Sequence, residues 1–148
     1  MTAPAPWTIH CDGSAVPNPG RMGLGALLVS PDGSRHALSV ATDLRGCNNE
    51  AEARALMLAL RDAQARGAAS LNIYSDSSVL VAQLGPGRAA PILRLADVYA
   101  EAKALLGTFA HVSLRWVPRH RNGDADALAR AALGLPPKAA LKIHKRRR

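Results

Sequence analysis

The sequence predicts an α/β domain in which helices flank a five-stranded mixed sheet. Three apolar runs separated by turn residues come first, and strand-like runs then alternate with helical patterns. A meander followed by such alternation produces a sheet with both antiparallel and parallel strands. The chain has 148 residues, of which 48% are hydrophobic, so it is long enough for one domain with one ordinary core.

The first three strands are predicted from the apolar runs at the N-terminus. The first run ends where Asp12 and Gly13 begin a segment rich in turn residues, and Pro31-Asp32-Gly33 is a strong hairpin signal between the next two. We therefore expect antiparallel strands over residues 7–11, 23–30 and 36–42.

The rest of the chain alternates between the two periodicities. Leu56, Leu60 and Ala63 recur at three- and four-residue spacing, which predicts a helix over residues 48–66, and Gly67 ends it. We then expect a strand at 70–76, helices at 77–84 and 92–106, a strand at 111–117 and a helix at 122–133.

The charge distribution divides the chain into a body and a tail. The formal net charge is +8, and six of the 19 lysine and arginine residues lie within residues 138–148. We expect a domain over residues 1–135 and a basic, flexible tail over 136–148. Such a charge favours a polyanionic partner, although a basic tail on a nearly neutral domain explains much of it.

Several protein classes find no support in the sequence. Cys11 and Cys47 are the only cysteines, which is too few for a zinc site built on cysteine. The N-terminus lacks the pattern of a signal peptide, and no apolar run approaches the length of a membrane span. We therefore expect a cytoplasmic protein without membrane contact, and nothing indicates a protein partner or an assembly beyond a monomer.

Acidic residues stand near the ends of predicted elements. Asp12 and Asp76 each follow a strand, Glu52 shares the apolar side of a helix, and Asp124 and Asp126 begin the last helix. Taken singly, each acid has a structural interpretation as a turn residue, a helix cap or a partner of the helix dipole. Together they would repel one another unless cations lie among them, and hard oxygen ligands suit Mg²⁺ or Mn²⁺. A basic protein with such a cluster suits phosphodiester hydrolysis.

Four motifs in this order resemble one known family, the type 1 ribonucleases H. The motifs are DGSAVPNPG (residues 12–20), NNEAEARAL (48–56), YSDS (74–77) and WVPRHRNGDADALARAA (116–132). The resemblance runs from Trp7 to Leu133 and implies the ribonuclease H-like fold. It also implies hydrolysis of the RNA strand of RNA–DNA hybrids with two Mg²⁺ ions, or Mn²⁺ as a substitute, leaving 3′-hydroxyl and 5′-phosphate ends.

The resemblance also implies roles for individual residues. It makes Asp12, Glu52, Asp76 and Asp126 the catalytic, metal-binding carboxylates, and it favours Glu52 over Glu50 and Asp126 over Asp124. Asn18, Asn48 and Asn49 match positions that contact the hybrid, and a carboxamide can both donate to and accept from a ribose 2′-hydroxyl.

The sequence departs from the family pattern in three places. His120 matches a histidine that assists catalysis in many members, but the loop before Asp126 is short, so His120 is either catalytic or a surface residue. The segment at residues 84–99 lacks the basic, tryptophan-containing protrusion that grips the DNA strand. Ser78 stands where a glutamine is common. The basic tail is a candidate replacement for the missing grip.

Two other functions remain compatible with the sequence. One is a nuclease of the same fold that acts on duplex RNA or on a DNA junction. The other is a basic nucleic-acid-binding protein without catalysis, in which the four acids would be incidental.

Overall fold

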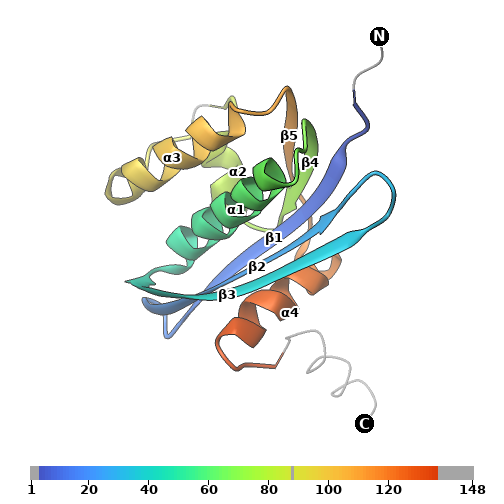
Figure 1. The fold of residues 1–148 in the computed structure, drawn as a ribbon. Helices are drawn as coiled ribbons and strands as arrows, with labels where there is room; N and C mark the ends of the chain where they lie inside the picture. Colours follow the sequence, from blue (N-terminus) through green and yellow to red (C-terminus); the bar gives the residue numbers. More distant parts are fainter. Residues whose placement is uncertain (1–3, 88, 137–148) are drawn as a thin grey trace.

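A computed structural model describes residues 4–87 and 89–136 and contains one five-stranded sheet with the strand order β3-β2-β1-β4-β5 (Figure 1). The strands are β1 (Trp7–Val16), β2 (Gly20–Val29), β3 (Arg35–Gly46), β4 (Ser70–Ser75) and β5 (His111–Trp116). β1, β2 and β3 pair antiparallel, whereas β4 lies parallel to β1 and β5 parallel to β4. The predicted fold class is therefore confirmed.

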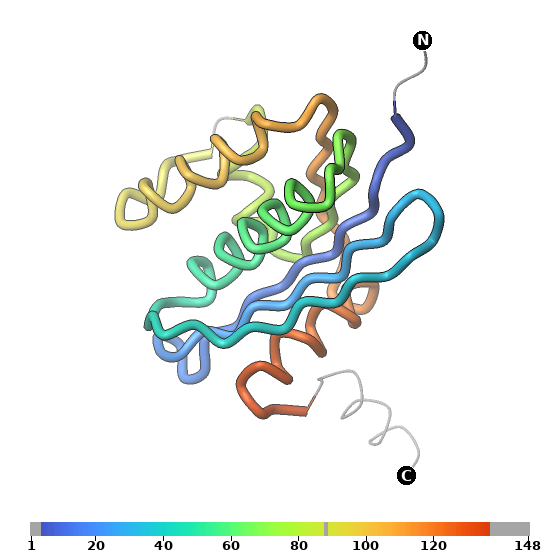
Figure 2. Tube along the Cα trace, viewed as in Figure 1, coloured from blue at the N-terminus to red at the C-terminus, as the bar shows by residue number. Residues whose placement is uncertain are grey.

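Helices cover both faces of this sheet. They are α1 (Asn48–Ala65), α2 (Ser78–Leu84), α3 (Ala96–Leu106) and α4 (Gly123–Ala132), with short 3₁₀ turns at η1 (Leu93–Leu95) and η2 (Arg119–Arg121). Both chain traces place α1 and α3 on one face and α4 on the opposite face (Figures 1 and 2). None of the helices in the described ranges is long and apolar enough to cross a membrane.

The predicted end of the first strand was wrong. β1 continues to Val16, and Asp12 pairs with Gly25 of β2 within the antiparallel ladder. Gly13 and Ser14 look like turn residues in the sequence, but the chain turns only at residues 17–19, after both have paired with β2. The parallel neighbour β4 does end here, because its last pair with β1 joins Ser75 to Cys11. Asp12 is thus the first residue of β1 beyond β4, close to where strand order changes direction.

Smaller differences concern other element ends. β3 is longer than residues 36–42 because its pairing with β2 continues through Arg45 and Gly46. The segment predicted as one helix over residues 92–106 begins with the η1 turn. α2 starts one residue late because Ser77 is its N-cap, accepting a hydrogen bond from the Leu80 amide at 3.1 Å. The predicted tail lies almost entirely outside the described residues.

Close contact between β1 and α1 requires a glycine at position 13. A Cβ atom on Gly13 would lie 2.1 Å from the carbonyl oxygen of Ala51 and 2.6 Å from the amide nitrogen of Glu52. The helix carries four fully buried alanines on this side, at positions 51, 55, 59 and 63. Small residues on both elements therefore bring the Glu52 side chain next to β1.

We expect Gly13→Ala to destabilise the fold by about 3 kcal/mol, because two backbone segments must separate. Gly87→Ala is the matched control, since nothing lies within 4 Å of a Cβ at that position. Chemical denaturation of both variants checks this expectation. A Gly13→Ala protein as stable as the control would contradict it.

The opposite face is packed in the same way. Cβ atoms on Gly23 and Gly25 of β2 would lie 2.3 Å and 2.4 Å from the carbonyl oxygens of Ala129 and Ala125. Gly23 and Gly25 therefore let α4 lie directly on the sheet. This places the first turn of α4 beside β1, where Asp126 is buried.

Candidate active site

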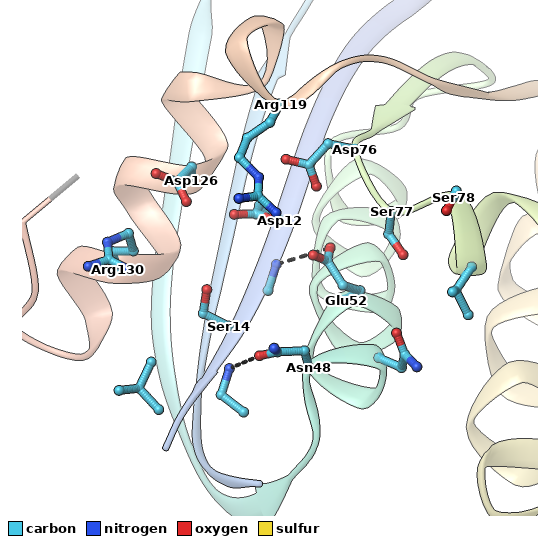
Figure 3. Close-up of a pocket in the computed structure, with 15 residues that line it drawn as sticks. Asp12, Ser14, Asn48, Glu52, Asp76, Ser77, Ser78, Arg119, Asp126 and Arg130 are labelled. Atoms are coloured by element: carbon cyan, nitrogen blue, oxygen red, sulfur yellow. Dashed lines mark hydrogen bonds between the residues drawn. The ribbon is translucent and has the colours of Figure 1, made fainter. Parts of the chain in front are cut away.

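Three carboxylates from three different elements meet at one edge of the sheet. One oxygen each of Asp12 on β1, Glu52 on α1 and Asp76 after β4 lies within 4.8 Å of the others. These residues line a cavity of about 290 Å³, and Asp126 of α4 lines it as well. Figure 3 shows the four carboxylates around this cavity.

Each acid is positioned by the fold rather than by local sequence. The backbone amide of Gly13 donates to Glu52 Oε2 at 3.2 Å, which holds the Glu52 carboxyl against β1. Asp76 lies between β4 and the N-cap of α2, and its carbonyl oxygen accepts a hydrogen bond from the Trp116 indole at 3.2 Å. The Asp126 amide belongs to the first turn of α4 and donates to the Asn122 carbonyl at 3.0 Å.

The electrostatics of this cluster are unfavourable in the absence of cations. Burial, with the charges of Asp76 and Asp126, raises the pKa of Asp12 to about 7, although a hydrogen bond with Glu52 opposes the rise. Burial and the charge of Asp12 raise the pKa of Glu52 well above its usual range. Burial also raises the pKa of Asp76, against the lowering effects of Arg119 and Asn122. The protein thus holds several acids in a place where their ionised forms are destabilised.

The competing acids in the same motifs point elsewhere. Asp126 is buried with 5% of its surface exposed and interacts with Asp12, whereas Asp124 is exposed and pairs with Arg35 at 3.5 Å. Two residues that are two positions apart on a helix face different directions. Glu50 forms an ion pair with Arg54 at 2.7 Å, one turn along α1, and does not line the cavity.

The three predicted substrate-binding asparagines are not equivalent. Asn48 and Asn49 line the cavity, and Asn48 Oδ1 accepts a hydrogen bond from the Ala15 amide at 2.8 Å. Asn18 does not line it; Asn18 Oδ1 accepts from the Asn48 amide at 3.0 Å and supports the start of α1. Ser78 also lines the cavity, at the position where the family often has glutamine.

His120 does not lie among the carboxylates. It is exposed on the η2 turn and lines a second cavity with His10 and Asp124. Its neighbour Arg119 lines the first cavity instead, and Figure 3 shows the Arg119 side chain reaching toward Asp12 and Asp76. The Arg119 charge lowers the pKa of Asp76, so this guanidinium is an electrostatic partner of the cluster.

Sequence reasoning missed Arg119 and also Arg130, which lines the same cavity from α4. The spacing of Asp126 and Arg130 on the helix predicts a shared face and could have identified Arg130. No comparable signal existed for Arg119, because the direction of side chains on a 3₁₀ turn is not apparent from the sequence.

The donor set suits a hard divalent cation. Carboxylate oxygens are the ligands that Mg²⁺ and Mn²⁺ prefer. Bound cations would stabilise the ionised forms that burial and mutual repulsion disfavour here. The nearest carboxylate oxygens of Asp12, Glu52 and Asp76 lie within 4.8 Å of one another, so small side-chain shifts would let them share one cation. Asp126 would extend the site on the side of α4.

We expect Mg²⁺ to raise the melting temperature more at pH 8 than at pH 5.5. Asp12 has a pKa of about 7 in the fold against an ordinary 3.8, so the stability that its protonation supplies is lost as the pH rises through 7. Cations can replace that proton, and saturation to 100 times the dissociation constant would stabilise the fold by about 2.7 kcal/mol. Thermal unfolding with and without Mg²⁺ at both pH values measures this. An equal shift at both would show that the raised pKa is not linked to cation binding.

Comparison with known proteins matches most of the chain. Residues 10–132 match the reverse transcriptase-like family. The bifunctional protein Rv2228c of Mycobacterium tuberculosis is 35% identical over 133 residues, which are 89% of this chain and 36% of that protein. Ribonuclease HI of Halobacterium salinarum is 37% identical over 124 residues, 84% of this chain and 62% of the relative. The chain thus spans about a third of the first relative and less than two thirds of the second.

Solved structures of these relatives have the same fold. The RNase H1 of Halobacterium salinarum superposes with a TM-score of 0.82 at 33% identity, covering 88% of this chain and 98% of that one. The N-terminal RNase H domain of Rv2228c has a TM-score of 0.79 at 34% identity, covering 86% and 98%. LC11-RNase H1 in complex with an RNA/DNA hybrid has a TM-score of 0.76 at 26% identity, covering 91% and 99%. Because the matched residues run from β1 to the end of α4 and include all four acids, the chain belongs to the ribonuclease H family of hydrolases.

Proposed function

We propose that the protein is an endonuclease that hydrolyses the RNA strand of RNA–DNA hybrids. The observation that carries this proposal is the meeting of Asp12, Glu52 and Asp76 within 4.8 Å, with pKa values raised above their ordinary range. An acidic cluster of this kind in a ribonuclease H fold suits metal-assisted attack on a phosphodiester. The relative LC11-RNase H1 has been solved in complex with an RNA/DNA hybrid, which supports the choice of substrate.

In the proposed mechanism the four carboxylates hold two Mg²⁺ ions, with Mn²⁺ as a substitute. When bound, such ions supply an activated water and stabilise the leaving oxygen of the phosphodiester. The chain itself orients the ligands: Gly13 fixes Glu52, and α4 presents Asp126 toward Asp12. The products would carry 3′-hydroxyl and 5′-phosphate ends.

Asn48 and Asn49 would identify the RNA strand. Asn48 Oδ1 already accepts a hydrogen bond from the Ala15 amide. The side-chain NH₂ group of Asn48 is therefore the part that would contact a ribose 2′-hydroxyl. Asn18 would act first by holding Asn48 in place, and its exposed position also leaves it within reach of a nucleic acid.

A labelled hybrid incubated with Mg²⁺ tests the proposal. We expect cleavage within the RNA strand, 5′-phosphate ends on the products, and little cleavage of duplex RNA or duplex DNA. Asp76→Asn should abolish the activity, whereas Asp124→Asn, which changes an exposed acid paired with Arg35, should retain it. Intact RNA at high concentration of the folded protein would exclude the proposed activity. Preferential cleavage of duplex RNA would identify a different substrate for the same site.

A further inference from the structure

Asn122 is a large buried polar side chain next to the acidic cluster. It lies between η2 and α4, and only 1% of its surface is exposed. Its Oδ1 atom has no hydrogen-bond partner among the residues that the structure describes. Burying an unpaired carbonyl oxygen costs folding free energy, so packing alone would favour an apolar residue here. The hydrogen bond donated by the Nδ2 atom of the same side chain explains why an asparagine is suitable at this position.

Asn122 connects the segments that carry three of the four acids. Its Nδ2 donates to the carbonyl oxygen of Cys11 at 3.0 Å, and Cys11 immediately precedes Asp12 on β1. The backbone carbonyl oxygen of Asn122 accepts a hydrogen bond from the backbone amide of Asp126 at 3.0 Å. The Asn122 side chain also lies close enough to Asp76 to lower the pKa of its carboxyl group. One residue therefore contacts β1, the β4–α2 connection and the first turn of α4.

The other contacts of α4 determine how closely it approaches the sheet. They constrain its position along β1 less strongly. Backbone atoms of Ala125 and Ala129 rest on Gly25 and Gly23, and such smooth contacts between small residues permit sliding. Two further directed contacts lie on the side of β3: the Ser39 hydroxyl donates to the Leu128 carbonyl at 2.6 Å, and the exposed Asp124 pairs with Arg35 at 3.5 Å. The hydrogen bond from Asn122 Nδ2 to the Cys11 carbonyl is directional, and Cys11 is the residue before Asp12. This hydrogen bond therefore opposes a shift of α4 along β1 at the place where the acids meet.

We propose that Asn122 is a positioning residue of the active site, which aligns Asp126 and Asp76 with Asp12 for cation binding and catalysis. The proposal rests on the proposed function for its catalytic part only. Outer partners that orient metal ligands typically affect metal affinity or activity by about 10- to 100-fold when they are replaced. A merely structural residue would affect stability without affecting either quantity.

The test compares Asn122→Leu with wild type and with Ile73→Val, a core change on β4. Leucine has the branching of asparagine, with bulkier methyl groups and no donor. It removes the unpaired Oδ1 but leaves the Cys11 carbonyl without this partner, so we expect the two effects on the melting temperature to offset one another in large part. We expect kcat to fall about 10- to 100-fold with KM for the hybrid nearly unchanged. The dissociation constant for Mn²⁺, measured by calorimetry without substrate, should rise about tenfold. Ile73→Val should lower only the melting temperature.

Asn122→Ser keeps a shorter donor and provides a second variant if leucine prevents folding. Serine should give intermediate values of both kcat and Mn²⁺ affinity. Wild-type kcat and wild-type Mn²⁺ affinity in either folded variant would overturn the positioning role. The calorimetric measurement needs no turnover, so it tests Asn122 even if the wild-type protein fails to cleave the hybrid.

Discussion

Replacing Asp12 with asparagine is expected to stabilise the metal-free protein while sharply lowering the rate at which it hydrolyses the hybrid. The carboxyl group has a pKa of about 7 in the fold against an ordinary 3.8, so at pH 8 the folded state holds an ionised group that the unfolded chain solvates better. A rise of the pKa from 3.8 to about 7 already includes the opposing hydrogen bond with Glu52 and corresponds to at most about 4 kcal/mol. Asparagine reproduces the neutral carboxyl only in part, which reduces the gain. We therefore expect a gain of about 2–4 kcal/mol at pH 8.

The same substitution should lower the cleavage rate by about three orders of magnitude, because Asp12 is central to the proposed cation site. Denaturation at pH 8 and at pH 4.5, without divalent ions, measures the stability effect, which should shrink at the lower pH because Asp12 is then protonated. Asp124→Asn is the matched control, since that carboxylate is exposed and pairs with Arg35. We expect little change in stability or activity in the control. If Asp12→Asn were less stable than wild type at pH 8, the ionised Asp12 carboxylate would stabilise the fold, and its pKa would not be raised.

The opposite signs of these two effects describe how this site is built. The chain keeps acids in a buried cluster where they cost folding free energy, and it balances the cost with dense packing around them. Gly13 and Gly25 permit backbone contacts that few other residues allow, and fully buried alanines line α1. Stability at the site is thus expected to depend on cation binding, as in proteins where a ligand stabilises only the folded state.

The order of strands and helices along the chain could be predicted well because its signals are local. The Pro31-Asp32-Gly33 turn between two apolar runs defines the β2–β3 hairpin, and the spacing of Leu56, Leu60 and Ala63 defines α1. The extent of β1 could not be predicted, because Gly13 and Ser14 favour turns by themselves. Pairing with β2 overrides that preference, and pairing between distant segments leaves no local signal.

The motifs predicted four acids that the structure places around one cavity, but they did not predict the residues around those acids. The helical spacing of Asp124 and Asp126 already indicates that only one of them faces the sheet. The sequence contains no signal for the role of Asn122, because an asparagine immediately before a helix is a common N-cap residue. Its hydrogen bond reaches Cys11, and only the folded chain brings these two residues together.

Arg119 is expected to matter more for catalysis than its neighbour His120, against the usual expectation for a histidine at that position. The Arg119 side chain lines the cavity of the four acids and lowers the pKa of Asp76, whereas His120 lines the second cavity. A guanidinium beside the cluster can hold a phosphate oxygen of the substrate through paired hydrogen bonds and stabilise charge that develops on it.

We therefore expect Arg119→Ala to lower kcat on the hybrid by about 100-fold, in the range found when one charge-stabilising donor is removed. His120→Ala changes the next residue of the same η2 turn and should alter kcat by less than about threefold, which makes it the matched control. Arg119→Lys should recover only part of the activity, because an ammonium keeps the charge but cannot form the paired bonds of a guanidinium. Single-turnover cleavage at saturating Mg²⁺ separates these effects from product release. If His120→Ala proves the more damaging of the two, the η2 turn must rearrange when substrate binds, and the histidine would regain the role that the sequence suggested for it.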